Sequence, residues 1–244
     1  MRANEQDVSL IIRQISDVLM INGGFLRNQG LYTGEMGLVL FFARYARHTQ
    51  NDLYMDYAYR LLGKIRNGIN RDMPISYKQG LAGIGSAIEY LVQNNYFEAD
   101  TDEVLEDFDQ RIFFTYNLPC LLIEEIIDIG YYANWRLSGN SSKKDLIRQT
   151  ILPQIEKTMR DKSVNPALNL SGQKTMPDSF EEKTSGHCLE LIAKNDFWNK
   201  DLGFQSGLVG WGLSLLTELD GDNTWFPLLP SNSKDAMHAI PTNH

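Results

Sequence analysis

The stretch Gly80-Leu-Ala-Gly-Ile-Gly85, with the apolar run that follows it, decides the expected fold. The pattern Gly-Leu-x-Gly-x-Gly returns at Gly207-Leu-Val-Gly-Trp-Gly212, and shorter forms stand at Gly34-Glu-Met-Gly37 and at Gly130. The intervals between corresponding glycines are 46, 47 and 80 residues, counted at Gly37, Gly83, Gly130 and Gly210. A unit that recurs at such a period is typical of stacked helix pairs.

A glycine-rich turn before an apolar helix has two interpretations. The amides at a helix N-terminus can hold a phosphate. However, the dinucleotide fingerprint is Gly-x-Gly-x-x-Gly after a strand, and here Gly-x-x-Gly-x-Gly follows no β-rich run. The alternative is that backbone passes close to a neighbouring helix, where a Cβ would clash. Recurrence of the motif favours this structural interpretation, since one protein does not need a series of phosphate sites.

Buried helices and helices with one polar face alternate along the chain. Residues 36–46 are apolar on almost all sides until Arg44, which indicates a buried helix. Residues 52–66 instead place an apolar stripe opposite Asp56, Arg60 and Lys64. Further helices are expected over 8–20, 101–113 (with Thr101 as N-cap), 143–160 (with a kink at Pro153), 184–197 and 207–219. The prediction is an all-α chain of paired inner and outer helices.

Composition and charge limit the expected partners. The chain has 43% hydrophobic and 22% charged residues, as is ordinary for a soluble globular protein. A net charge of −8 without a block of Lys or Arg argues against nucleic acid or an anionic membrane as partner. The N-terminal residues do not form a signal peptide, no apolar run reaches spanning length, and two cysteines make no disulfide framework. We therefore expect a cytoplasmic protein.

The domain organisation is expected to be simple. Residues 1–244 form one predicted domain, with an irregular insertion over 161–185 and an irregular tail over 221–244. The insertion shows little periodicity and contains Asn165-Pro166, Gly172 and Pro177, which indicates a long ordered loop. It accounts for the interval of 80 residues between Gly130 and Gly210, where the period of the repeat predicts about 46.

The glycine motifs resemble the inner-helix starts of the lanthionine synthetase C-like family. The resemblance is carried by Gly34-x-x-Gly-Leu, by Ser76 to Gly85 and by Gln205 to Gly212, and it extends over about residues 31–219. It implies an α/α toroid of inner and outer helices. It also implies work on ribosomally made peptides: in the family, a zinc ion activates cysteine thiols, which add to dehydrated Ser or Thr residues and close thioether rings.

The number of motifs bears on whether such a ring closes. Four glycine motifs are fewer than a six- or seven-fold toroid needs. Either one repeat is degenerate within residues 161–185, or the ring is incomplete, or a partner chain completes it. An incomplete ring exposes apolar inner faces, which favours association. A peptide substrate, a partner protein and an oligomer are therefore the expected partners.

The zinc ligands of the family are not found at matching positions. A zinc site that activates a thiol needs three protein ligands and an open position. In the family these are a cysteine in one glycine loop and a Cys-His pair before the glycine of a later one. Here Gln205 and Ser206 precede Gly207, and Lys78 and Gln79 precede Gly80. We expect no metal at these positions.

One other set of residues could hold zinc. His187 and Cys188 are adjacent, with Cys120 as a distant third ligand. Neighbouring residues on a regular helix point about 100° apart, so both can bind one metal only at an irregular helix end. The favoured interpretation is a buried Cys188 beside a solvated His187.

Candidate peptide-binding residues lie near two of the glycine motifs. Tyr131, Asn134 and Arg136 combine aromatic and polar groups on one inner segment, and Gln205 precedes the last motif. Tyr and Arg are favoured contact residues at interfaces. The alternative is that the inner segment belongs to the core, with Arg136 against a carboxylate. The acidic stretch 100–109 is interpreted as a solvated helix face.

Three functions follow from these observations. The leading hypothesis is a lanthionine synthetase C-like protein that binds or presents a peptide without zinc-dependent ring closure, which leaves open whether it is an enzyme. The second is an α/α-toroid glycoside hydrolase, with paired carboxylates drawn from Glu124, Glu125 and Asp128. The third is a plain helical-repeat interaction module.

Overall fold

The computed structural model describes residues 4–114, 120–163, 183–194, 197–198, 200–205 and 207–229. Within these ranges the chain forms helices and turns and no β-strand, which confirms the all-α prediction. The helices group into two compact units, each with its own core. The single-domain prediction stays a prediction.

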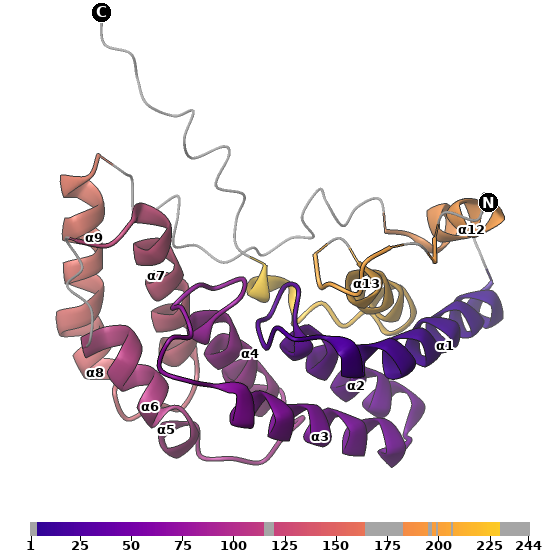
Figure 1. Ribbon diagram of the computed structural model, residues 1–244, viewed down its shortest axis with the longest axis horizontal. Helices are drawn as coiled ribbons and strands as arrows, with labels where there is room; N and C mark the ends of the chain where they lie inside the picture. The colour runs from indigo at the N-terminus through magenta and orange to yellow at the C-terminus, as the bar shows by residue number, and fades with distance from the viewer. Residues whose placement is uncertain are drawn as a thin grey trace, which may run out of the picture. The chain divides into compact units, whose positions relative to one another are not determined.

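The first unit combines Met1–Pro74, Lys78–Gly80 and Met176–Thr224. Its described helices are α1 (Glu5–Asn22), η1 (Gly23–Phe25), α2 (Glu35–Thr49), α3 (Asp52–Gly68), α12 (Ser185–Ala193) and α13 (Leu208–Asp220). Helix α2 lies at the centre of this unit and packs against α3 and α13, while α1 packs against α13 (Figure 1).

The pair formed by α2 and α3 matches the expected inner and outer helices. Every residue of α2 from Glu35 to Ala46 is buried, whereas α3 buries only Ala58, Leu61 and Ile65. The buried stretch of α2 includes Arg44, where the sequence predicts that apolar character ends. The Arg44 guanidinium donates hydrogen bonds to the Asp220 carboxylate (3.1 Å) and to Thr217 Oγ1 (3.1 Å) on α13.

The glycines of the last motif allow α13 to approach α2 closely. A Cβ on Gly212 would lie 2.4 Å from the ring of Phe41, a distance that van der Waals contact does not permit. The structural interpretation of the motif is therefore confirmed at this position, because the residue at 212 must lack a side chain for these helices to pack as they do.

The second unit combines Ile75–Tyr77, Leu81–Thr175 and Trp225–His244. Its described elements are α4 (Leu81–Gln93), α5 (Thr101–Val104), α6 (Glu106–Asp109), η2 (Gln110–Phe114), α7 (Ile123–Ser138), α8 (Lys144–Leu146), η4 (Ile147–Ile151), α9 (Leu152–Asp161) and η5 (Phe226–Leu228). Helix α4 packs against α7, and α7 packs against α9 (Figure 1).

Two predicted helices of this unit are interrupted. The helix expected over 101–113 is split into α5, α6 and η2, and its N-cap is Asp100, whose carboxylate accepts the Asp102 amide (2.9 Å), in place of Thr101. The kink expected at Pro153 takes the form of η4, a π-helical turn just before that residue. Proline cannot donate to the helix ladder, so the preceding turn widens. The predicted inward residues are nevertheless buried, namely Ile147, Ile151, Ile155 and Met159.

The irregular regions expected from the sequence lie mostly outside the described residues. Of the insertion over 161–185, residues 164–182 are outside them, and Thr184 caps α12 by accepting the His187 amide. Of the tail over 221–244, residues 230–244 are outside them, and η5 occupies part of the remainder. Among the described helices, none combines the length and apolar character that crossing a membrane requires.

A glycine-loop cluster as the candidate functional site

Three loops that lead into buried helices are built alike. In each, a loop carbonyl accepts a hydrogen bond from the amide seven residues later, in the first turn of the helix. The pairs, acceptor first, are Asn28 with Glu35 (2.9 Å), Gln29 with Met36 (3.2 Å), Ile75 with Ala82 (2.8 Å), Asp201 with Leu208 (2.8 Å) and Leu202 with Val209 (3.4 Å). The repeat inferred from the glycines is therefore also a repeat of backbone hydrogen bonds.

The first and last loops share a side-chain turn that the sequence analysis did not identify. The side-chain oxygens of Asn28 and Asp201 accept the amides of Gly30 and Gly203, each at 2.7 Å. Such Asx turns fix the backbone conformation from the Asn or Asp to the residue two positions later. The signal was present in the sequence as Asn or Asp six residues before the glycine that precedes each helix.

These loops contact one another through their backbones within the first unit. The Tyr32 amide donates to the Lys78 carbonyl (2.8 Å), and the Phe204 amide donates to the Tyr32 carbonyl (2.7 Å). A Cβ on Gly30 would lie 2.4 Å from Gln79 Cα, so this loop can approach its neighbour only without a side chain. We call residues 28–34, 78–80 and 201–205 the glycine-loop cluster.

The surface of the cluster is polar. The side chains of Thr33, Lys78, Gln79 and Gln205 are exposed, while Tyr32 is buried beneath them. The Lys78 ammonium lies 6.0 Å from the centroid of the Tyr32 ring, within cation–π range. The exposed groups are one cation, two amides, one hydroxyl and the carboxylate of Asp201, which also accepts from the Gly203 amide. These groups can donate hydrogen bonds to peptide groups and accept hydrogen bonds from them.

The donor set of the cluster does not fit a zinc ion. Zinc takes cysteine sulfur, histidine nitrogen or carboxylate oxygen. At the positions before the helix-start glycines, the described residues are instead the ammonium of Lys78 and the amides of Gln79 and Gln205, and Ser206 lies outside the described residues. The part of the chain that the structure describes contains no group of three or more His, Cys, Asp or Glu that could hold a metal.

The other zinc candidates are not residues of the cluster. Cys188 on α12 is fully buried, and the His187 ring stacks on Trp211 with centroids 5.9 Å apart. Burial raises the pKa of the Cys188 thiol to about 12, an effect that Lys200 opposes and Glu218 reinforces. Cys120 is exposed and belongs to the second unit. Cys188 is thus a protonated, inaccessible thiol at neutral pH.

We expect the two thiols to differ strongly in alkylation rate. In native protein at pH 8, iodoacetamide should modify Cys120 and leave Cys188 unmodified, because only the Cys120 thiol is accessible to the reagent. In denaturant both should react. Peptide mass mapping over time measures the two rates. Equal rates in native protein would contradict the burial of Cys188.

The predicted peptide-binding residues on α7 belong mainly to the core of the second unit. Tyr131 is buried and its ring centroid lies 5.3 Å from that of Tyr77. Asn134 is half-buried, and Arg136 is 0% exposed. Gln205, the fourth predicted residue, is exposed in the glycine-loop cluster. Of these four residues, Gln205 is therefore the one whose side chain is exposed.

Arg136 is the centre of a buried ionic network, as the alternative interpretation expects. Its guanidinium binds the carboxylates of Glu89 (2.8 Å), Asp109 (3.0 Å) and Asp102. The Asp109 carboxylate also accepts from Tyr132 (2.7 Å). The interpretation of residues 100–109 as a solvated face is therefore wrong for Asp102 and Asp109, which face Arg136.

The pKa of Asp102 should make stability depend on pH. Burial raises this pKa, but hydrogen bonds from Ser142, Ser141 and Arg136 outweigh burial and hold the pKa well below its ordinary value. A lowered pKa in the folded state contributes stability above the ordinary pKa, which is about 3.9, and that stability is lost as the pH falls.

Asp102→Asn should therefore destabilise the protein most at neutral pH. We expect a loss of about 1–3 kcal/mol at pH 7, the usual range for hydrogen bonds to a charged group, and a smaller loss at pH 3. Urea unfolding at both pH values measures it, with the exposed Asp145→Asn as control. A pH-independent difference would contradict the lowered pKa.

The carboxylates considered for glycoside hydrolysis lie in the first two turns of α7. Glu125 accepts a hydrogen bond from the Leu122 amide (2.9 Å) and so caps the N-terminus of α7. Glu124 is exposed and Asp128 is half-buried. Glu125 therefore has a structural role that the sequence analysis did not foresee, which is typical of acidic residues in the first turn of a helix.

Comparison with known families bears on the first two loops. Residues 26–128 match the family described as Lanthionine synthetase C-like protein. These residues are thus similar to lanthionine synthetase C-like proteins. The matched segment includes helices α2 to α6 and the loops before α2 and α4. The loop before α13 lies outside the matched residues and is related to them by its hydrogen bonds. No curated protein and no solved structure matches the chain.

Proposed function

We propose that this protein takes part in the maturation of a ribosomally made peptide by binding or presenting it at the glycine-loop cluster, without closing thioether rings itself. Two observations support the proposal: residues 26–128 match the lanthionine synthetase C-like family, and Lys78, Gln79 and Gln205 precede the helix-start glycines where the resemblance leads us to expect cysteine or histidine. Amide and ammonium groups suit hydrogen bonding to peptide, but they do not activate a thiol.

The geometry of the cluster supports binding to extended peptide. Backbone hydrogen bonds hold Tyr32 between Lys78 and Phe204, so the loops that display the exposed groups are ordered before any ligand arrives. Preorganised polar groups bind with less loss of conformational entropy than mobile ones do. A polar, peptide-sized surface of this kind supports recognition more than it supports proton transfer.

A peptide-display selection tests the binding step. A random linear library and a second library with cysteine and dehydroalanine are panned on the wild-type protein and on the triple variant Lys78→Ala, Gln79→Ala, Gln205→Ala. All three side chains are exposed, so the variant should fold. The exposed pair Lys157→Ala, Lys162→Ala on and beside α9 is the control. We expect enriched peptides that bind wild type and control but lose at least tenfold in affinity for the triple variant.

The same peptides test the non-catalytic part. Peptides with cysteine and dehydroalanine are incubated with the protein and zinc chloride. Because ring closure leaves the peptide mass unchanged, the remaining free thiols are alkylated with iodoacetamide, and the alkylated fraction is measured by mass spectrometry. No acceleration over zinc alone is expected. Catalysed ring closure would overturn the non-catalytic proposal, and enrichment that is equal on the triple variant would overturn the assignment of the cluster as the binding site.

A further inference from the structure

The end of α1 displays two large apolar side chains. Phe25 is 80% exposed and Ile21 is 70% exposed, the two highest values among large hydrophobic residues of the described chain. They are four residues apart in helical backbone that runs from α1 into η1, so they lie on the same side of it. Neighbouring exposed apolar side chains often mark a contact surface.

This turn is held firmly from α3. The Lys64 ammonium donates to the carbonyls of Gly24 (3.1 Å) and Leu26 (3.2 Å) and pairs with the buried carboxylate of Glu35. The Tyr57 hydroxyl donates to the Met20 carbonyl (3.2 Å). Hydrogen bonds on both sides of Phe25 therefore fix the position from which its ring projects, as is favourable for an interface anchor.

Two arginines lie near the two apolar residues. Arg27 is exposed one residue after Leu26, and the Arg60 guanidinium lies 5.4 Å from the centroid of the Tyr57 ring, beside the end of α1. The charge of Lys64 is matched by Glu35, so the two arginines, against the one exposed carboxylate of Asp17 a turn before Ile21, give this surface its positive charge. We call Ile21, Phe25, Arg27 and Arg60 the basic knob.

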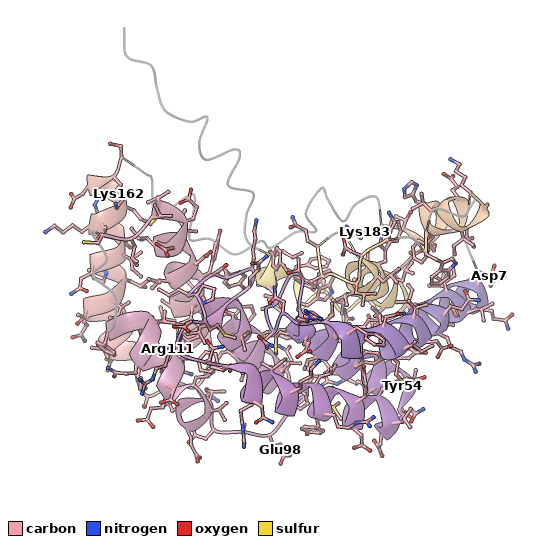
Figure 2. The ribbon with its side chains drawn as sticks, in the orientation of Figure 1. Asp7, Tyr54, Glu98, Arg111, Lys162 and Lys183 are labelled. Atoms are coloured by element: carbon pink, nitrogen blue, oxygen red, sulfur yellow. The ribbon has the colours of Figure 1, made fainter. Side chains whose placement is uncertain are left out.

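The chain also carries a surface of opposite charge. Exposed carboxylates surround the exposed side chain of Val104 (46%) along α5, α6 and the segment before them: Glu98, Asp100, Glu103, Glu106 and Asp107. Glu98 is labelled in Figure 2. We call these residues the acidic face. Like the basic knob, it has an apolar centre and a rim of one sign of charge.

We propose that the basic knob of one copy of this chain docks on the acidic face of a second copy. The apolar centres come into contact there, and Arg27 and Arg60 meet carboxylates. Because the two surfaces differ, the contact is head-to-tail: each added copy leaves one knob and one acidic face open. This association is independent of peptide binding at the glycine-loop cluster.

Sedimentation velocity over a concentration series tests the contact. We expect concentration-dependent association that weakens at high salt, because salt screens exposed charges. Phe25→Ser and the pair Glu103→Lys, Glu106→Lys should each weaken it by about 30-fold or more, the effect of losing a central anchor. Leu53→Ser, which changes another exposed apolar residue of the first unit, should leave it unchanged.

Mixing the two damaged proteins gives the decisive result. Phe25→Ser retains an intact acidic face, and Glu103→Lys, Glu106→Lys retains an intact knob. A head-to-tail contact therefore predicts that the mixture forms a one-to-one pair, although neither variant associates alone. A wild-type protein that stays monomeric at millimolar concentration, a mixture that forms no pair, or association unaffected by Phe25→Ser overturns the proposal. Binding of a labelled poly-glutamate peptide by monomeric wild type would assign the knob to a different acidic partner.

Discussion

Arg136→Met is expected to lower the free energy of unfolding by about 3–5 kcal/mol, the usual cost of breaking a buried ion pair. The substitution leaves the carboxylates of Glu89 and Asp109, at 1% and 0% exposure, without the guanidinium that binds both. Lys143 reaches Asp109 (3.0 Å), so Glu89 loses its ionic partner in the network entirely. An uncompensated charge in the core is what makes the loss large.

Urea unfolding at pH 7, followed by circular dichroism, measures this loss. Arg160→Met is the matched control, because Arg160 pairs with Glu156 at 3.4 Å on the surface and both side chains are exposed. Its loss should stay below about 1 kcal/mol. Arg136→Lys should fall between the two, since it keeps the charge but not the planar fork. An Arg136→Met protein as stable as the control would show that the carboxylates do not need the cation.

Gly30→Ala is expected to destabilise the protein by about 2–3 kcal/mol, towards the upper end of the overpacking range. The new Cβ would lie 2.4 Å from Gln79 Cα and 2.6 Å from the Gln79 carbonyl carbon. These are backbone atoms, which cannot rotate away as a side chain can. The loops must therefore separate, and the hydrogen bond from Tyr32 to Lys78 should lengthen or break.

Gly63→Ala provides a control of the opposite sign. Gly63 lies inside α3, and a Cβ there would have no atom within 4 Å. Alanine favours a helix interior over glycine, so this change should stabilise the protein by about 0.5–1 kcal/mol. Thermal unfolding of both variants measures the difference. Stabilisation by Gly30→Ala as well would mean that the two loops do not touch.

The helices themselves could be predicted from local patterns. Helix α3 shows its apolar stripe within the sequence, and its buried residues Ala58, Leu61 and Ile65 follow that stripe. Helix α2 was identified by a nearly continuous apolar run, and α13 by its glycine motif. In each case the deciding information lies within about fifteen residues, which is the range over which helix periodicity can be read.

The ionic contacts could not be predicted in the same way. Arg136 binds Asp109 and Glu89, which are 27 and 47 residues away along the chain. Arg44 binds Asp220, 176 residues away. No local pattern couples such residues, so a charged group in an apolar helix could be interpreted either as part of a cavity or as part of the core.

The candidate binding residues also differ in whether the local sequence could predict their exposure. Gln205 was assigned through its place before a glycine motif, and loop residues at such positions are exposed. Tyr131 and Arg136 lie on α7, whose residues 129–133 are buried on all sides of the helix. There the sequence does not indicate which side of the helix faces a ligand. The shared position of Asn28 and Asp201, six residues before the glycine that precedes the helix, could have been found by aligning the two loops on their glycines.

The backbone bonds of Tyr32 also set the order in which this protein can be completed during synthesis. Tyr32 bonds to Lys78 and to Phe204, and these two partners are 126 residues apart in the sequence. At about 5–20 residues per second, a ribosome needs roughly 6–25 s to make that interval. Until α13 emerges, the faces of α1 and α2 that it covers have no helix packed against them. The packing of the N-terminal helices α1 and α2 is therefore completed only after residues 208–220 have been synthesised.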